Sequence, residues 1–382
     1  MGESRLLVHC DLDAFFAAVE VLHRGLDPAR PLIIGSDPQQ GRGRGIVSTC
    51  NYAARTFGIR SAMPISEAWR RCPGPPHGHG TYVRGSHRLY GRASRKVMDV
   101  LRGVGGAFEQ ASIDEAYLDI TEAVHGDWDA GLALCEHLQS EVRASTGLSA
   151  SFGLAPTRIL AKMSSEERKP GGVFRLMPGD AAGFLHGRPM RDLPGVGPAT
   201  ATALSEWGVE TIDEAYALGT LALGRMAGDR FAKWLSSVVE GTSSDEVSPL
   251  QSRRSIGKER TFEVDVQDHE VVMERLFELV HRVMESARQM GVVGRLAEVK
   301  IRYTGFDTHT HRRSIPVGMD DVDVFIGIAG RLFALSVEHE RPVRLIGFRL
   351  GDLEDPRTRQ TTLMRYEGES ASFEPMHRGE DG

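Results

Sequence analysis

The sequence has few cysteines, no long apolar run and no secretion signal at its start. The four cysteines, Cys10, Cys50, Cys72 and Cys135, are widely separated and fit neither metal-finger nor redox-pair spacing, so we expect them to be reduced and structural. No apolar stretch approaches the roughly 20 residues that span a bilayer. Residues 6–10 at the N-terminus are strand-like, without a basic region followed by an apolar one. We therefore expect a cytoplasmic protein that makes no use of membranes.

A basic excess, the usual sign of nucleic-acid binding, is also missing. The 382 residues hold 46 Lys and Arg against 52 Asp and Glu, a formal net charge of -6, which argues mildly against phosphate contacts. The distribution of charge points the other way. Acidic residues gather around Asp245 and Glu246 and in the tail, whereas one C-terminal stretch is basic: Arg253, Arg254, Lys258, Arg260, Lys300, Arg302, Arg312 and Arg313. The net charge therefore conceals a basic face.

The apolar pattern of the first half predicts a β-α-β-β-α-β unit. Strand-like runs cover residues 6–10, 108–113, 116–120 and 150–154, and helical spacing covers 130–142 and 156–168. A large insert, residues 21–82, follows the first strand and predicts a small separate lobe. The chain is longer than one hydrophobic core usually supports, so two to four domains are expected.

A helical region and a second mixed unit follow. Residues 171–176 close the first unit, and a helical segment is centred on residues 193–198. A stretch of small polar residues from 241 predicts a flexible linker. Beyond it, strands at 255–264, 297–304, 312–317 and 343–350 surround helices at 269–288 and 322–335, which repeats the β-α-β-β-α-β order. The polar residues from 353 onward predict a disordered tail.

Three acidic residues fall where predicted strands end. Asp11 ends the first strand, and Asp114 and Glu115 occupy the tip of the predicted hairpin. Neighbouring central strands would bring the three carboxylates to one sheet edge, where they repel one another unless they share a cation. An all-oxygen group suits Mg²⁺, and two such ions can hold the attacking and leaving oxygens of an in-line phosphoryl transfer. Taken alone, Asp-x-Asp and Asp-Glu pairs are also common surface turns.

The residues around these carboxylates carry a family resemblance. The first catalytic motif of the Y-family DNA polymerases, and of their bacterial polymerase IV group, is similar to HCDLDAFFAAVE, residues 9–20; the second is similar to SIDEAYLD, residues 112–119. By this resemblance Asp11, Asp114 and Glu115 hold two Mg²⁺ ions, with Mn²⁺ as a substitute, and the Leu12 carbonyl is a further ligand. Asp13 and Asp119 lie in the same motifs, and we expect them to be structural.

A second segment, VSTCNYAARTFGIRSAMP at residues 47–64, resembles the family's fingers motif, in which a tyrosine and an arginine grip the triphosphate. Arg55 offers a charge-assisted fork to phosphate oxygens, and Tyr52 offers a hydroxyl one helical turn away. Thr49 is expected to add a phosphate contact. The alternative is an ion pair of Arg55 with Glu20 or Glu115.

Two lysines and one departure complete the comparison of this pocket. Lys169, in RKPGG, falls where the family places its triphosphate lysine, although a lysine before a proline is usually just solvated. Lys162 is expected to support the site from a helix without touching nucleotide. The family usually has glutamate where this chain has Ala53, a change that removes no phosphate donor.

Four apolar residues are expected to shape the space for the nucleotide. Phe16 falls where the family carries an aromatic ring beneath the sugar, which leaves no room for a 2′-hydroxyl. Phe15 is placed in the same pocket, although its side chain fits a core position better. Ile46 and Ala62 resemble the positions that roof the templating base, and the bulk of Ile46 predicts a poor fit for large lesions.

Two regions resemble the parts with which the family holds DNA. Gly195 and Gly197 lie in a segment like a helix-hairpin-helix, whose backbone N–H groups approach a phosphate, although such turns are common between helices. Charged residues that alternate with apolar ones resemble the family's little-finger strands and predict one basic sheet face: Arg253, Arg254, Lys258, Arg260, Lys300 and Arg302. The alternative is a solvated basic sheet. DNA contacts of this kind are sequence-blind and sensitive to salt.

The tail contains a short candidate for partner binding. Residues 360–364, with Gln360, Leu363 and Met364, are a degenerate likeness of the peptides by which bacterial polymerases grip the replication sliding clamp. Short peptides match by chance, and a tail without a partner is an equal alternative.

The resemblance covers residues 5–352 and implies an α+β polymerase built as a right hand. Its parts would be a ferredoxin-like palm (1–20 and 83–177), small fingers (21–82), a helical thumb with a helix-hairpin-helix (178–240), a linker (241–252), a β-α-β-β-α-β little finger (253–352) and a disordered tail (353–382). The implied protein is a monomer that extends primer-template DNA with deoxynucleoside triphosphates at low fidelity, across lesions and without proofreading.

Two rival functions remain. A catalytically silent homologue would bind primer ends as a scaffold, but the intact carboxylates Asp11, Asp114 and Glu115 argue against it. A nucleotidyl cyclase shares the two-metal chemistry, but it has no use for a helical thumb or a basic C-terminal unit.

Overall fold

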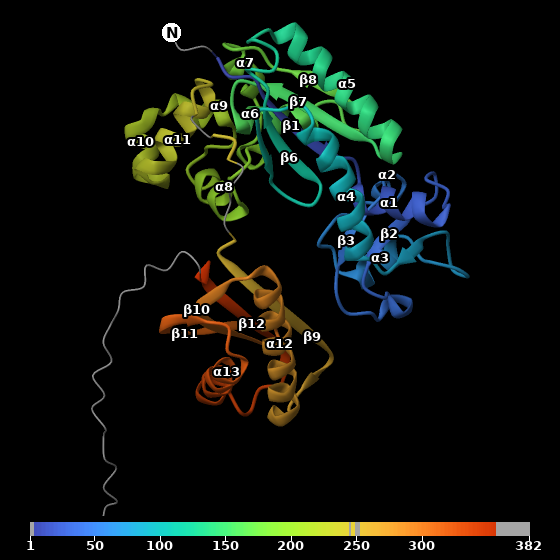
Figure 1. Cartoon of the computed structure of the whole chain (residues 1–382), viewed down its shortest axis with the longest axis vertical. Helices are drawn as coiled ribbons and strands as arrows, with labels where there is room; N and C mark the ends of the chain where they lie inside the picture. Colours follow the sequence, from blue (N-terminus) through green and yellow to red (C-terminus); the bar gives the residue numbers. More distant parts are fainter. Residues whose placement is uncertain (1–3, 244–245, 249–252, 357–382) are drawn as a thin grey trace, which may run out of the picture. The chain divides into compact units, whose positions relative to one another are not determined.

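The computed structural model describes residues 4–243, 246–248 and 253–356 of the chain. They fall into two compact units, Met1–Gln251 and Ser252–Gly382 (Figure 1). Helices and sheets mix in both units, which confirms the α+β class. Among the described residues, no helix has the length and apolar character that a membrane crossing requires.

A five-stranded sheet forms the centre of the first unit. Its strands are β1 (Leu7–Leu12), β5 (Ala107–Gln110), β6 (Glu115–Asp119), β7 (Ala150–Ala155) and β8 (Val173–Arg175), in the order β5-β6-β1-β7-β8. The central strand β1 runs antiparallel to both neighbours, β6 and β7. The helices of this part are α4 (His87–Arg102), α5 (Trp128–Thr146) and α6 (Arg158–Glu166). The order of elements confirms the predicted β-α-β-β-α-β unit.

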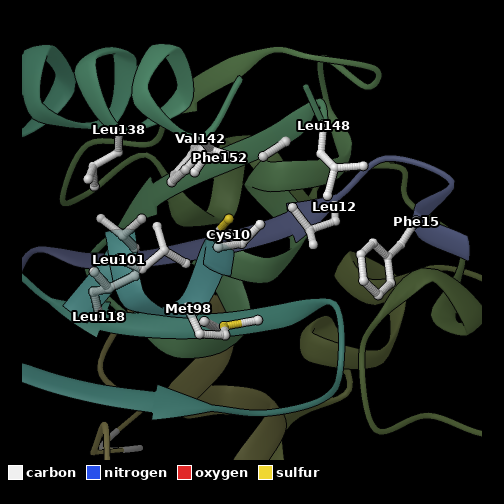
Figure 2. Close-up of a cluster of buried hydrophobic side chains, with 14 of the residues drawn as sticks. Cys10, Leu12, Phe15, Met98, Leu101, Leu118, Leu138, Val142, Leu148 and Phe152 are labelled. Atoms are coloured by element: carbon white, nitrogen blue, oxygen red, sulfur yellow. The ribbon is translucent and has the colours of Figure 1, made fainter. Parts of the chain in front are cut away.

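Alternation along β1 divides the two faces of this sheet. Cys10 and Leu12 point into a core with Met98 of α4 and Leu138 of α5, as Figure 2 shows. His9 faces the other way, where its ring meets Ser165 of α6. Because strand side chains alternate, Asp11 lies on the same face as His9, beside α6.

The insert after β1 folds around a smaller sheet. Strands β2 (Leu32–Gly35), β3 (Val47–Cys50) and β4 (Thr81–Val83) pair in the order β3-β2-β4. The helices are α1 (Phe15–Arg24), α2 (Tyr52–Arg55) and α3 (Ile65–Arg71), with a 3-10 turn, η1, at Gln39–Gly41. Helix α1 runs past residue 20, so the predicted boundary of the insert cuts a continuous helix, and α1 packs on α4, β2 and β3.

The rest of the first unit is helical, as predicted. It consists of α7 (Ala181–Leu185), η2 (Met190–Asp192), α8 (Pro198–Ser205), α9 (Ile212–Ala217), α10 (Gly219–Ala227) and α11 (Asp229–Val239). These helices share a core with α6, including Leu160, Leu193 and Leu235.

The second unit is a four-stranded antiparallel sheet with two helices. Its elements are β9 (Ser255–Val266), α12 (His269–Met290), β10 (Val293–Tyr303), β11 (Thr308–Met319), α13 (Val322–Ser336) and β12 (Val343–Glu354), and the strand order is β11-β10-β12-β9. Phe325 of α13 packs on Phe348 of β12, so the helices cover one sheet face. The predicted β-α-β-β-α-β order is confirmed.

Three boundaries differ from the prediction. The strand predicted at 108–113 ends at Gln110, because the Ser112 hydroxyl accepts hydrogen bonds from the backbone N–H groups of Asp114 and Glu115 and makes a turn. Strand β12 continues to Glu354, two residues into the predicted tail, and Leu353 pairs with Gly294. The predicted flexible linker is partly docked, as described next.

Residues 246–248 of this linker pack against the edge of the five-stranded sheet. Val247 is buried with Leu7 and Tyr117. The backbone N–H of Ser248 donates to Glu109, and Arg158 donates to the carbonyl of Glu246. An apolar contact and two hydrogen bonds therefore hold residues 246–248, where the polar composition predicted flexibility.

Candidate active site

The pairing of β1 with β6 brings two of the predicted metal-binding residues together. Asp11 lies directly opposite Glu115 in the antiparallel register, a position in which Cβ atoms are about 5 Å apart. The backbone N–H of Leu12 donates to the carbonyl of Asp114 at 3.1 Å. The backbone thus gathers Asp11, Leu12, Asp114 and Glu115 at one end of the two central strands.

The hairpin tip is held by Ser112. Its hydroxyl oxygen accepts from the N–H groups of Asp114 at 3.1 Å and Glu115 at 3.0 Å. The hydroxyl proton is donated to Asp114 Oδ1 at 2.5 Å. One serine therefore fixes both the turn and the direction of the Asp114 carboxylate.

Two lysines neutralise the carboxylates. Lys169 Nζ lies 2.9 Å from Asp11 Oδ1 and 2.6 Å from Glu166 Oε1, and Lys162 Nζ contacts Glu115 Oε1. Burial raises the pKa of Asp11 to about 7 against the opposing charge of Lys169. Lys162 thus contacts a predicted metal-binding residue from α6, and its supporting role without nucleotide contact stays a prediction.

His9 is a buried neighbour of the site that the sequence reasoning missed. Its Nδ1 lies 2.8 Å from Ser165 Oγ. Because the Ser165 hydroxyl already donates to the Lys162 carbonyl, Nδ1 is the protonated nitrogen, and Nε2 faces Glu115 Oε2 at 4.0 Å. Burial, followed by the charge of Lys162, lowers the pKa of His9 well below its usual value. The available signal was the alternation that puts His9 and Asp11 on one face.

The donor set fits a hard cation, although the side chains do not yet form a ligand group. Carboxylate and carbonyl oxygens are the donors that Mg²⁺ prefers. Within the described ranges, no three acidic, imidazole or thiol side chains converge closely enough to hold a metal ion. Asp11 and Glu115 are each engaged by an ammonium group instead. The positive charge that these carboxylates require is supplied by Lys169 and Lys162.

The other two acids of the motifs are structural, as predicted. Asp13 is buried and accepts hydrogen bonds from Ser149 Oγ, Ser151 Oγ and the Gly171 N–H. Asp119 lies at the far end of β6 and accepts from the backbone and hydroxyl of Thr121. Asp13 thus ties the β1–α1 turn to β7 and to the loop that follows Lys169.

Asn51 positions the short helix α2 and was also missed. Its Oδ1 accepts from the N–H groups of Ala54 and Leu32, and its Nδ2 donates to the carbonyls of Pro28 and Arg30. All four bonding positions of this buried amide are used. An asparagine just before a helical segment is a common N-cap, so the sequence did contain the signal.

Tyr52 and Arg55 begin and end α2. The Arg55 guanidinium lies 4.5 Å from the centre of the Tyr52 ring. Burial raises the pKa of the Tyr52 hydroxyl, and the negative charge of Asp13 raises it further. Thr49 is half-buried on β3.

The two alternative partners of Arg55, Glu20 and Glu115, bind other residues. Glu20 accepts from Arg24 and Tyr90, and Glu115 pairs with Lys162.

The four predicted pocket residues differ in exposure. Phe15 is 2% exposed, so its side chain belongs to the core, as expected for that side chain, and a nucleotide contact of this residue stays a prediction. Phe16 is only partly buried and stacks on Tyr90 with ring centres 4.2 Å apart. Ile46 and Ala62 are both exposed and adjacent, because Ile46 bridges to Pro64 and the Ala62 N–H donates to the Val47 carbonyl.

The predicted helix-hairpin-helix lies between η2 and α8. Gly195 has φ +97°, and Trp234 lies 3.6 Å from where a Cβ would be, so this turn requires glycine. Gly197 is the N-cap of α8, with open space at its Cβ position. A groove joins this loop to α6, and its lining includes Lys162, Arg188, Arg191 and Gly195.

The basic residues of the second unit do not share one face, contrary to the prediction. Lys300 lies opposite Gly347, which lies opposite Glu259, and Lys300 pairs with Glu259 at 2.5 Å. Lys258 lies opposite the buried Phe348, and the next two-residue step puts Arg260 on the same side. Lys258 and Arg260 therefore point to the helix-covered side, on the edge strand β9.

The open face carries a mixed set of charges. Arg302 shares this face with Lys300, and Arg312 and Arg349 both lie opposite Glu298; Arg349 pairs with Glu298 at 2.6 Å. Arg253 and Arg254 are exposed before β9. Residues 360–364, the predicted clamp peptide, lie outside the described residues.

Comparisons with known proteins show the family of the chain. The profile of the impB/mucB/samB family matches residues 10–166, and that of its C-terminal domain matches residues 253–363. DNA polymerase IV of Methanoculleus marisnigri is 38% identical over 95% of this chain and 98% of its own length. The chain belongs to the Y family of DNA polymerases. DNA polymerase IV of Streptococcus mutans is 35% identical over 94% of this chain and 95% of its own length.

Solved structures of the Y family are similar as well. A chimera, Dbh-Dpo4(243-245)-Dbh, superposes with a TM-score of 0.82 at 26% identity and covers 91% of this chain and 99% of its own. The insertion ternary complex of Dbh DNA polymerase has a TM-score of 0.64 at 25% identity, with the same coverage.

Proposed function

We propose that this Y-family member is a translesion DNA polymerase that adds deoxynucleotides to a primer 3′ end by two-metal phosphoryl transfer, at low fidelity and without proofreading. Family membership supports the polymerase activity. The observation that supports the mechanism is the register of β1 and β6, in which Asp11 faces Glu115 with Asp114 one residue away. These carboxylates lie at the end of the two strands, where Lys169 and Lys162 contact them.

The proposed metal ligands are the carboxylates of Asp11, Asp114 and Glu115 and the carbonyl of Leu12. Bound Mg²⁺, or Mn²⁺ in its place, would supply the positive charge that makes the primer 3′-oxygen a better nucleophile and stabilises charge on the phosphoryl oxygens. Ser112 would hold the Asp114 carboxylate in place.

Four cationic and polar groups would bind the triphosphate. Lys169 already lies against Asp11, so its ammonium is within reach of a phosphate that enters beside that carboxylate. Arg55 and Tyr52 are held on α2 by Asn51, and Thr49 lies on the preceding strand. A guanidinium and an ammonium are the usual phosphate-binding groups.

The remaining contacts would select the sugar and hold DNA. Phe16 would occupy the space of a ribose 2′-hydroxyl, and Ile46 and Ala62 would cover the templating base. The N–H groups of the Gly195 loop would bind a primer phosphate. The open sheet face of the second unit, with Lys300 and Arg302, would contact the duplex. Binding of the sliding clamp, a monomeric state and a cytoplasmic location stay predictions.

Extension of a primed template with Mg²⁺, on plain and damaged strands, tests this function. Asp114→Ala should lower the rate on the order of a thousandfold, the scale of losing charge stabilisation at the reacting centre. Asp119→Asn is the matched control, since its carboxylate lies at the other end of β6 and accepts hydrogen bonds from the backbone and hydroxyl of Thr121. Primer binding without extension by the unaltered chain would favour the silent scaffold instead, and equal extension by Asp114→Ala would exclude the proposed site.

A further inference from the structure

Glu20 is a buried carboxylate next to the proposed sugar-selecting residue. Its side chain is fully buried in α1. Oε1 accepts from the Tyr90 hydroxyl at 2.7 Å, and Oε2 accepts from Arg24 Nε at 2.5 Å. Burying a carboxylate is costly unless it is paired and hydrogen-bonded, so both partners are needed at this position.

Tyr90 contacts both Glu20 and Phe16 and thereby connects them. The two aromatic rings stack with centres 4.2 Å apart and planes within 10°. Tyr90 is 1% exposed, and it comes from α4, 70 residues away from Glu20 in the chain. The Tyr90 ring therefore forms a wall behind Phe16, and its hydroxyl anchors that wall to α1.

The packing around the Tyr90 hydroxyl leaves it little freedom. A Cβ added at Gly85 would lie 3.0 Å from this hydroxyl and 3.1 Å from Ile34 Cγ2. Burial raises the pKa of Tyr90, and the bond to Glu20 raises it further. The phenol thus stays protonated and donates to Glu20.

We infer that Glu20 and Tyr90 are positioning residues for sugar selection: their hydrogen bond fixes the ring against which Phe16 rests. This inference rests on the proposed function. A steric clash changes steeply with distance, so a small retreat of Phe16 would admit a 2′-hydroxyl while leaving room for a deoxyribose. Loss of the bond should therefore raise ribonucleotide incorporation more than it changes deoxynucleotide incorporation.

The test measures kcat/KM for a deoxynucleotide and for the matching ribonucleotide in the full chain. Tyr90→Phe keeps the ring and removes the hydroxyl, and the deoxy-to-ribo ratio should fall about tenfold, the scale of one hydrogen bond to a charged group. Glu20→Leu removes the acceptor and should lower the ratio equally. Glu20→Gln keeps an oxygen for the Tyr90 hydroxyl and should retain most of the ratio.

The double variant and a control make the outcome decisive. Tyr90→Phe combined with Glu20→Leu should fall no further than either alone, because both remove the same bond. Tyr82→Phe removes a hydroxyl from β4 of the smaller sheet, which donates to the carbonyl of Cys72 at the end of α3. This change should leave the ratio unchanged. Thermal melting shows that each variant is folded.

Several results would overturn the inference. They are an unchanged ratio in Tyr90→Phe, a parallel change for both sugars, or an equal fall in Glu20→Gln and Glu20→Leu. If the unaltered chain incorporates no deoxynucleotide at all, the proposed function fails first, and the two failures are thereby distinguished.

Discussion

Replacement of Gly153 by alanine tests how closely the sheet and α6 must approach for the site to form. Gly153 lies in β7, where it pairs with His9. A Cβ added there would lie 2.1 Å from the Ala161 carbonyl oxygen and 2.4 Å from the Ser165 nitrogen, both backbone atoms of α6. Because an ordinary contact needs at least 3.4 Å, α6 has to move away by roughly 1 Å.

The structure gives a magnitude for this displacement. Overpacking by one methyl costs about 1 to 3 kcal/mol, and close contacts with two backbone atoms of α6, which a side-chain rotation cannot relieve, favour the upper end, about 3 kcal/mol. For a unit of this size, that corresponds to a fall in Tm of about 6 to 12 °C. The same movement carries Lys162 and Ser165 away from Glu115 and His9. A misplacement of about 1 Å near reacting groups can cost a hundredfold in rate.

The assay combines thermal unfolding with primer extension. All four tryptophans of the chain, Trp69, Trp128, Trp207 and Trp234, lie in the first unit, so their fluorescence reports the unfolding of this unit. Gly183→Ala is the control, since this glycine of α7 has open space at its Cβ position and alanine favours a helix. A Gly153→Ala protein with unchanged Tm and unchanged extension rate would refute the reasoning.

Three other perturbations follow from contacts in the site and in the second unit. Asn51→Ala removes the cap of α2 and should raise the nucleotide KM about fivefold, with a smaller change in kcat, in single-nucleotide insertion; an unchanged KM would exclude its positioning role. Burial acts to raise the pKa of Glu109, but hydrogen bonds, foremost that from Arg158, hold it below its usual value. This carboxylate therefore stabilises the fold above its ordinary pKa, and Glu109→Gln should lower Tm at pH 7 by an amount that shrinks as the pH falls and vanishes once the carboxyl is protonated in the folded protein; a pH-independent difference would contradict this. Lys300→Ala should reduce the salt slope of DNA binding by about one and Lys258→Ala by less, in binding titrations at several salt concentrations, whereas a larger effect of Lys258→Ala would assign DNA to the other face.

The sequence predicted the elements that depend on local pattern. A strand-like run of mostly apolar residues located β1, and the acidic pair at 114–115 marked the hairpin tip, because both signals are contained in a few neighbouring residues. The structure confirms that Asp11 and Glu115 meet across two strands.

The partners of these carboxylates could not be predicted in the same way. Lys169 reaches Asp11 across 158 residues of sequence, and His9 meets Ser165 only because β1 and α6 pack together. Contacts of this kind depend on tertiary packing, which the periodicity within one strand does not predict.

The split of the basic residues in the second unit has a similar cause. From Gly257 to Thr261 every residue of β9 is exposed, so alternation within this edge strand does not show which side chains face the helices. Only the pairing of Lys258 with Phe348 decides it. The docking of Val247 likewise depends on a distant surface, that of Leu7 and Tyr117.

The two-sided character of β1 makes this strand sensitive to the number of its residues more than to their identity. An exchange of one apolar residue for another at Leu12 would alter packing by a methylene or so. A single deletion between Leu7 and Cys10 would instead invert every later position of the strand, sending Asp11 into the hydrocarbon interior and Cys10 to the face beside α6. Insertions and deletions in this segment should therefore be absent from active relatives, even where substitutions accumulate.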